Sequence, residues 1–199
     1  RILDLGCGDA RFGRFALEQG CATYLGVDGS TNMVAAGEGI LAGSSGRVMH
    51  ESIEEWAFPH EAFDLAVSSL APHYLAEVKT VFAGAYRALV GGGKLVFSIE
   101  HPVITSCARG WGEGKRADWI VDDYFVEGPR VTSWLGGRVV KFHRTIETYV
   151  AAMQKAGFVL DAVRESAPRR ERFTDEGEFE RRRRIPLFLF VAGHKPERP

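Results

Sequence analysis

Two glycines and an aspartate near the start of the chain have the types and the spacing of a ligand-binding site. Gly6 and Gly8 are separated by one residue and follow a short apolar run. Glycine allows the backbone to turn tightly and to approach a ligand, because it has no Cβ. Asp28 ends a second apolar run about twenty residues after Gly8, where nucleotide-binding α/β sheets place a carboxylate against the ribose hydroxyls. The pattern predicts a site for a nucleoside cofactor.

The identity of that cofactor depends on Asp4, which comes just before the glycines. A carboxylate at this place would repel a pyrophosphate and attract an ammonium group. The third glycine of the dinucleotide-binding pattern is also missing, because Ala10 and Gly13 are nearby but out of phase. Both features favour S-adenosylmethionine, which has adenosine at one end and a zwitterionic amino acid at the other, over a nicotinamide dinucleotide.

Motifs along the rest of the chain support this choice. In order they are Leu3–Gly8, Phe63–Leu65, Leu89–Leu95, Ser98–Pro102 and Lys155–Phe158. With these motifs the chain resembles class I S-adenosylmethionine-dependent methyltransferases, and more narrowly the group that acts on small molecules. The resemblance implies S-adenosylmethionine as cofactor and S-adenosylhomocysteine as product. There are two departures from the family: Ala10 replaces its usual third glycine, and its N-terminal helix is expected to be absent, since the chain begins at the first strand.

The resemblance also implies a set of cofactor-binding residues. Asp4 and the glycine loop would hold the methionine end, and Asp28 the ribose. By position in the family, the turn after the third strand would lie against adenine and supply Ser52, Ile53 and Glu54. The set is completed by the neighbours of the glycine turns and by the end of the fourth strand, namely Cys7, Gly29, Ser69 and Leu70.

Apolar runs and helical periodicities alternate along the chain and predict its fold. We expect one Rossmann-like, doubly wound α/β domain over residues 1–199, with a mostly parallel seven-stranded sheet and an antiparallel edge strand. Strands are expected near 2–5, 23–28, 47–50, 63–68, 94–99, 158–164 and 185–192, and helices near 11–20, after Ser30, near 78–89 and near 146–156.

Residues 101–145 are expected to form a lid inserted after the fifth strand. The segment is rich in aromatic residues, including Trp111, and alternates apolar and polar residues around Gly136 and Gly137, which predicts a two-residue hairpin. An insertion at the functional edge of a sheet can shape the substrate pocket. The other interpretation is a structural flap whose tryptophans only pack on the core.

Four side chains at this edge or in the lid are candidates for a catalytic base or for orienting the acceptor. They are His73, His101, Tyr124 and His143. A base is needed only where the acceptor must lose a proton to become nucleophilic, and a lone histidine is more often structural than catalytic. Each of the four therefore has a catalytic and a structural interpretation.

Composition narrows the class of protein. The 199 residues carry 25 basic and 26 acidic side chains, a formal net charge of −1, which argues against a nucleic-acid partner. The three cysteines have no CxxC spacing, so we expect neither a disulfide framework nor a metal site. No apolar run is long enough to cross a bilayer, so we expect a cytoplasmic protein, monomeric or homodimeric.

The expected function is transfer of a methyl group from S-adenosylmethionine to a small-molecule acceptor by in-line displacement, with the acceptor atom opposite the departing sulfur. One alternative is a non-catalytic S-adenosylmethionine-binding module, because binding and transfer use the same fold. A nicotinamide-dependent oxidoreductase is the less favoured alternative. The acceptor itself cannot be identified from the sequence.

Overall fold

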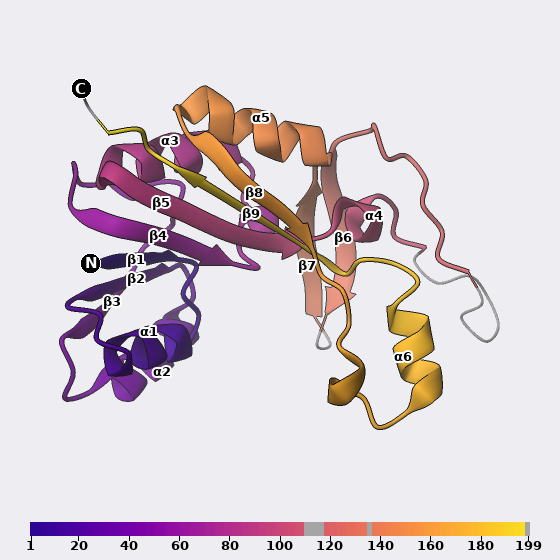
Figure 1. Cartoon of the computed structure of the whole chain (residues 1–199), viewed down its shortest axis with the longest axis horizontal. Coiled ribbons are helices and arrows are strands. Elements are labelled where there is room, and N and C mark those ends of the chain that lie inside the picture. Colours follow the sequence, from indigo (N-terminus) through magenta and orange to yellow (C-terminus); the bar gives the residue numbers. More distant parts are fainter. Residues whose placement is uncertain (110–117, 135–136, 198–199) are drawn as a thin grey trace.

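The first strand lies inside the sheet, between two parallel neighbours, and three of its four side chains are apolar. The computed structural model describes residues 1–109, 118–134 and 137–197, without the side chains of 133 and 134. The seven strands have the order β3-β2-β1-β4-β5-β9-β8 (Figure 1). Their bounds are β1 Ile2–Leu5, β2 Tyr24–Asp28, β3 Gly46–His50, β4 Phe63–Ser69, β5 Leu89–Glu100, β8 Val159–Glu165 and β9 Phe188–His194.

The pairing confirms the predicted mostly parallel α/β sheet. β1 pairs in parallel with β2 and β4, β2 with β3, and β4 with β5. β9 is antiparallel to both β5 and β8, which makes the predicted antiparallel pair at one edge of the sheet. The carboxyl ends of β1, β2, β4 and β5 therefore meet at one edge, where folds of this kind hold ligands.

Helices cover the two faces of the sheet unequally. The principal helices are α1 Arg11–Glu18, α2 Thr31–Leu41, α3 Val78–Ala88 and α5 Ile146–Ala156. Helices α3 and α5 pack on one face, where Phe82 and Tyr149 meet Phe97 of β5 in the main core. Helices α1 and α2 lie beside β1 to β3 on the opposite face, around Tyr24 and Leu41. Ser30 and Thr145 cap α2 and α5 as predicted, each by accepting a backbone N–H.

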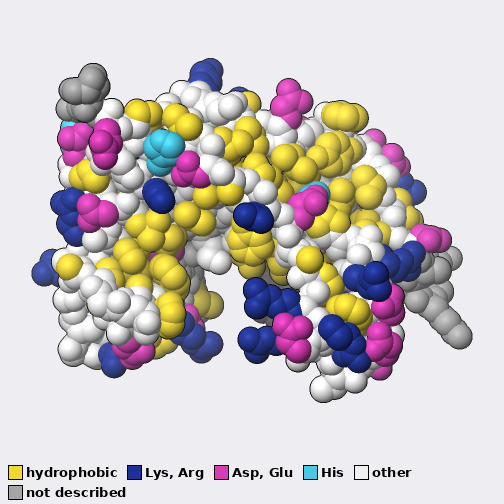
Figure 2. All heavy atoms as spheres, in the orientation of Figure 1, with side chains coloured by type: hydrophobic (Ala, Val, Ile, Leu, Met, Phe, Trp, Pro, Cys, Tyr) yellow, Lys and Arg dark blue, Asp and Glu magenta, His cyan; other side chains and the backbone are white. Residues whose placement is uncertain are grey.

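The face of β4, β5 and β9 opposite α3 and α5 is open among the described residues. Val96 and Phe190 on this face are 36% and 42% exposed, and Phe12 of the neighbouring helix α1 is 42% exposed. Figure 2 shows apolar side chains gathered over the strands that Figure 1 labels β5 and β9. Parallel sheets usually have both faces covered, so this exposed apolar surface is a distinctive feature of the chain.

Two insertions extend from the ligand-binding edge. After β5 come α4 Pro102–Thr105 and a separate hairpin of β6 Gly128–Trp134 and β7 Gly137–His143. Between β8 and β9 the chain forms the short η2 Arg170–Arg172 and α6 Glu176–Arg182; η1 Pro72–Tyr74 follows β4. The predicted hairpin is present, but Gly137, which was expected in its turn, lies in β7 opposite Trp134; Trp111 and Gly136 lie outside the described residues.

The structure differs from the sequence-based expectation at two elements. Helix α3 ends at Ala88, and the fifth strand begins at once with Leu89, so the three glycines 91–93 lie inside β5 and do not form a loop. Gly92 has φ 74°, and its N–H bonds to the carbonyl of Lys195, so the strand absorbs an irregular stretch there. Helix α6 was not expected in the charged segment 165–184.

Candidate functional site

The loop after β1 has the backbone conformation that glycine favours. Gly6 and Gly8 have φ of 74° and 54°. A Cβ on Gly6 would lie 2.3 Å from the Cβ of Ala71, so this glycine allows the loop to pack against the turn after β4. A Cβ on Gly8 would meet nothing within 4 Å. Gly8 therefore faces open space, where the backbone is accessible to a ligand.

Ala10, which stands where a third glycine was expected, has a left-handed backbone conformation. It is fully buried, has φ 57° and stands at the N-cap of α1. A left-handed conformation costs a residue with a Cβ about 1 to 2 kcal/mol. The chain tolerates this strain at the entrance to the helix that follows the loop.

Asp28 is joined to the glycine loop by direct hydrogen bonds. Its Oδ2 accepts from the N–H of Gly8 at 2.8 Å, and its Oδ1 from the N–H of Ser30 at 2.9 Å. A carboxylate has about four acceptor sites, so both oxygens can accept further bonds from a ligand. Gly29 beside it is exposed, and a Cβ there would meet only the Glu51 carbonyl at 3.9 Å.

Asp4 lies deep behind the loop. The Tyr24 hydroxyl donates to Asp4 Oδ2 at 2.7 Å, and Asp4 is only 3% exposed. Burial raises its pKa to about 6, with the Asp28 charge adding to the effect and the Tyr24 bond opposing it. Asp4 and Ser69 line one cavity of about 190 Å³ with Phe12, Val96, Ser98 and Phe190. The structure thus brings two predicted cofactor residues from different strands together.

Cys7, between the two glycines, stays protonated. Its Sγ lies 3.6 Å from the Gly8 carbonyl. Burial, together with the charges of Asp4 and Asp28, raises the pKa of the thiol to about 12. Cys7 therefore contributes packing and shape, and not a thiolate.

The predicted adenine turn is placed close to the loop, but its three residues differ in environment. Ile53 is buried, with its Cδ1 3.5 Å from where a Cβ of Gly6 would be. Ser52 is exposed. The Glu54 carboxylate accepts the backbone N–H of Glu77 at 2.7 Å, so it holds the start of α3.

The end of β4 has a strained backbone. Leu70 has φ 54° and is 38% exposed. Its N–H donates to the carbonyl and to the Oγ of Ser98 on β5, at 2.9 and 3.1 Å. Left-handed residues that are not glycine cluster at ligand sites, and this one lies at the sheet edge beside Ser69.

The three histidine candidates are buried and engaged in bonds within the protein. His73 accepts the Glu100 N–H at 3.4 Å, and burial, reinforced by Lys141, lowers its pKa to about 3. His101 caps α4 through the Val103 N–H, and its Nε2 lies 3.0 Å from Glu165. Burial is also the main cause that lowers the pKa of His101.

His143 and Tyr124 belong to the interior of the insertion. The His143 ring nitrogens lie 2.8 Å from the Thr105 hydroxyl and 2.9 Å from the Tyr124 carbonyl, which satisfies both. Burial lowers the pKa of His143. The Tyr124 hydroxyl accepts the first N–H of α5, from Ile146, at 3.5 Å. The structure therefore gives each of the four candidates a structural partner, and it brings two of them, His143 and Tyr124, into contact.

Sequence reasoning missed an ion pair at the end of β5. Lys141 Nζ on β7 lies 2.6 Å from Glu100 Oε1, and the two side chains are only 7% and 18% exposed. The same ammonium group lies 5.9 Å from the ring centre of Tyr74 in η1. The strand end placed Glu100 at this edge, but Lys141 occupies an ordinary position in an alternating hairpin strand. No local pattern marks it.

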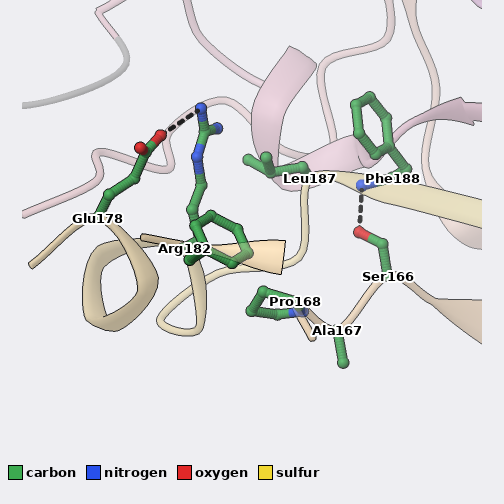
Figure 3. Close-up of a pocket in the computed structure, with 8 residues that line it drawn as sticks. Ser166, Ala167, Pro168, Glu178, Arg182, Leu187 and Phe188 are labelled. Atoms are coloured by element: carbon green, nitrogen blue, oxygen red, sulfur yellow. Dashed lines mark hydrogen bonds and ion pairs between the residues drawn. The ribbon is translucent and has the colours of Figure 1, made fainter. Parts of the chain in front are cut away.

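Two further cavities lie near this edge. One of about 220 Å³ lies between the end of β5, α4 and the hairpin, lined by Glu100, Ile104, Trp119, Arg130, Thr132, Lys141 and their neighbours. The other, of about 380 Å³, lies between the β8–β9 insertion and the start of β9 (Figure 3). In the second cavity Arg182 points to Glu178 at 3.6 Å, and the Phe188 N–H donates to Ser166 Oγ (Figure 3). Those polar groups have partners, whereas the Thr132 hydroxyl in the smaller cavity has none among the described residues, so the smaller cavity is the better candidate for chemistry.

The described residues contain no cluster of three metal-ligating side chains. Nor is any helix in the described ranges long and apolar enough to span a bilayer.

Comparisons with known proteins identify the family. Residues 3–97 match the methyltransferase domain family. The crystal structure of an S-adenosylmethionine-dependent methyltransferase from Mesorhizobium loti is 38% identical, with a TM-score of 0.90 over 98% of this chain and 90% of that one. A Listeria monocytogenes protein, proposed to be a methyltransferase of the same kind, is 33% identical, with a TM-score of 0.89 and coverage of 98% and 90%.

An uncharacterized protein of Haemophilus influenzae is 30% identical over 213 residues, which is 100% of this chain and 82% of that protein. The chain belongs to the S-adenosylmethionine-dependent methyltransferases. Its cofactor is accordingly S-adenosylmethionine, as the Gly6 to Gly8 loop and Asp28 predicted.

Proposed function

We propose that the protein transfers a methyl group from S-adenosylmethionine to a small-molecule acceptor by in-line displacement. The observation that carries the proposal is the arrangement at one sheet edge. The glycine loop, Asp28 and the buried Asp4 lie at the ends of β1 and β2, and a cavity lies at the end of β5. Cofactor and acceptor would then meet near the end of β4, which lies between them.

Three features of the glycine loop fit this cofactor. Gly8 offers a backbone with no Cβ and open space in front of it. Asp28 has acceptor capacity left for two ribose hydroxyls. Asp4 is an acid that is costly to ionise where it stands, so a ligand ammonium group would stabilise its charge. We assign Asp28 to the ribose, Ile53 to the adenine face and Asp4 to the amino end.

When bound, the sulfonium supplies a methyl group to the acceptor atom, and the electron pair of the broken methyl–sulfur bond stays on sulfur. The proton of the acceptor leaves to a base or to solvent. The chain's own contribution is position and environment. The histidine candidates are poor bases at neutral pH, because burial lowers the pKa of each of them. We therefore propose that catalysis depends on alignment of the acceptor and not on a histidine base.

The size and charge of the site support a small acceptor. The cavity at the end of β5 is about 220 Å³, a volume that suits a small molecule and is too small for a polymer. The net charge of −1 provides no general attraction for nucleic acid. Methyl-labelled S-adenosylmethionine, incubated with the enzyme and a cell extract, should label the low-molecular-weight fraction. Labelling confined to protein or nucleic acid would contradict the proposal.

The cofactor assignment has its own test in Asp28→Ala. Calorimetric titration with S-adenosylhomocysteine should give a dissociation constant at least tenfold higher than that of the wild type, a loss of about 1.4 kcal/mol or more. Glu38→Ala, which removes an exposed carboxylate on α2, is the matched control and should bind normally. NAD should bind to neither protein. Unchanged affinity in Asp28→Ala would remove the ribose role.

A further inference from the structure

The cavity at the end of β5 has an apolar body and a charged rim. Ile104, Ala108 and Trp119 supply apolar wall, and the Trp119 indole N–H is directed away to the Val103 carbonyl at 2.8 Å. The charged groups that line it are Glu100, Arg130 and Lys141. A ligand that fills this cavity must match both surfaces.

The charges of the rim do not cancel. Lys141 and Glu100 pair at 2.6 Å and neutralise each other. Arg130 instead donates to backbone carbonyls: its Nε to Ser106 at 3.0 Å and its Nη groups to Pro129 and Val126. No carboxylate of the described residues pairs with Arg130. Carbonyl oxygens satisfy hydrogen bonds but bring no negative charge, so the described side chains that line the cavity have one positive charge in excess.

Two side chains of the cavity, Arg130 and Thr132, have donor groups left for a ligand. A guanidinium has five N–H groups, of which the three carbonyl contacts use three. On the same strand, the Thr132 hydroxyl lines the cavity and is buried without a hydrogen-bond partner among the described residues. Buried hydroxyl groups without a partner are uncommon in native structures. A ligand acceptor atom placed here would satisfy both side chains.

We propose that this cavity is the acceptor pocket, and that the acceptor is a small, largely apolar molecule with one carboxylate that binds to Arg130 and Thr132. The inference rests on the proposed function, since it names the class of acceptor for that reaction. A neutral acceptor would leave the Arg130 charge without a counter-charge. A cationic acceptor would face two cations and a carboxylate that is already bound to Lys141. The carboxylate would anchor the acceptor at its far end, with the reacting atom toward Tyr74 and Leu70.

The test compares benzoate with benzamide, which has the same ring and no charge. Both are titrated at low salt into the wild-type protein saturated with S-adenosylhomocysteine, and the indole N–H signal of Trp119 is followed by nuclear magnetic resonance. Benzoate should shift this signal and bind at least tenfold more tightly than benzamide. Equal binding of the two, or no shift of the Trp119 signal by benzoate, would overturn the inference.

Substitutions locate the charge that is responsible. Arg130→Met should weaken benzoate binding at least tenfold and leave benzamide unchanged, and Arg130→Lys should keep most of the benzoate affinity. Arg138→Met removes an exposed arginine of the same hairpin, outside the cavity, and should have no effect. If Arg130→Met does not fold, the ligand comparison in the wild type and Arg130→Lys still decides.

The binding of S-adenosylhomocysteine and the binding of benzoate test the proposed function and the carboxylate site separately. Tight S-adenosylhomocysteine binding with no preference for benzoate refutes the carboxylate site and leaves the methyltransferase site intact. Absence of S-adenosylhomocysteine binding refutes the cofactor assignments on which the proposed function rests. In that case a preference for benzoate would show a carboxylate site that does not serve methyl transfer, and so would also refute the acceptor role.

Discussion

Replacement of Asp4 by asparagine should make the unliganded protein more stable. Asp4 is 3% exposed, and its one hydrogen-bond donor from a side chain is the Tyr24 hydroxyl at 2.7 Å. Asparagine keeps an oxygen that can accept this bond and has the same shape. The substitution therefore removes the buried charge and little else.

The magnitude follows from the pKa of Asp4. Burial raises it from 3.8 to about 6, and each pKa unit corresponds to about 1.4 kcal/mol. The ionised carboxylate should thus lower the free energy of unfolding by about 3 kcal/mol at pH 7.5. The folded state holds this proton more tightly than the unfolded chain, so the stability associated with Asp4 falls as the pH rises from about 4 to 6. At pH 5 the difference between wild type and variant should be about half as large.

Urea unfolding of the wild type and Asp4→Asn at pH 7.5 and pH 5 measures this difference. Glu38→Gln, on an exposed face of α2, is a control that should match the wild type at both values. If Asp4→Asn is no more stable at pH 7.5, or if its advantage is the same at pH 5, burial does not raise the free energy of ionised Asp4. The same variant should bind S-adenosylhomocysteine at least tenfold more weakly, a loss of about 1.4 kcal/mol, because the carboxylate that we assign to the amino end is gone.

Three further substitutions test other parts of the structure. His73→Asn should resist acid better than the wild type. The pKa of His73 is lowered from 6.5 to about 3 in the folded protein, so the unfolded chain binds the proton first as the pH falls. The free energy of unfolding of the wild type should therefore fall by about 2 kcal/mol between pH 7.5 and 5, and that of the variant should not show this loss. Gly157→Ala should lower the free energy of unfolding by at least about 1 kcal/mol in thermal melts, because φ there is 107° and a Cβ would lie 2.8 Å from the Tyr86 ring. Glu100→Gln should lower the free energy of unfolding by about 3 to 5 kcal/mol, because it removes the carboxylate that pairs with buried Lys141. In a double-mutant cycle, adding Lys141→Met should restore most of that free energy.

Most of the sheet could be predicted because each strand and helix is marked by its own residues. The apolar run over β4 and the stripe of Val81, Phe82 and Ala85 on α3 are local patterns. The stripe on α3 is buried, whereas β4 is only partly buried because one of its faces is open. Helix α6 was missed because its segment is charged on all sides. Its start does carry a signal in Asp175, which accepts the N–H of Glu178 in the spacing of a capping box.

The sequence predicted that the glycine loop and Asp28 lie together, and the structure joins them by a hydrogen bond from the Gly8 N–H to the Asp28 carboxylate. Their placement follows from glycine turns and strand ends, which are local features of the sequence. The proposed acceptor pocket depends on contacts between distant residues. Lys141 meets Glu100 across 41 positions, and His143 meets Thr105 across 38. Residue type drew attention to the histidines, whereas only the folded chain shows that each of them has a hydrogen-bond partner within the protein.

The residues assigned to the cofactor and those of the proposed acceptor pocket lie on different parts of the fold. The residues that we assign to the cofactor lie on β1, β2 and the turn after β3, whereas Arg130, Thr132 and Lys141 lie on a hairpin that forms its own two-stranded sheet. The hydrogen bonds of Arg130 go to Ser106, Pro129 and Val126, none of which we assign to the cofactor, so Arg130→Met should alter the acceptor pocket without moving Gly8 or Asp28. Sites more than about 7 to 10 Å apart without shared partners usually act independently. Acceptor preference in this chain should therefore follow the hairpin, and cofactor affinity the loop after β1.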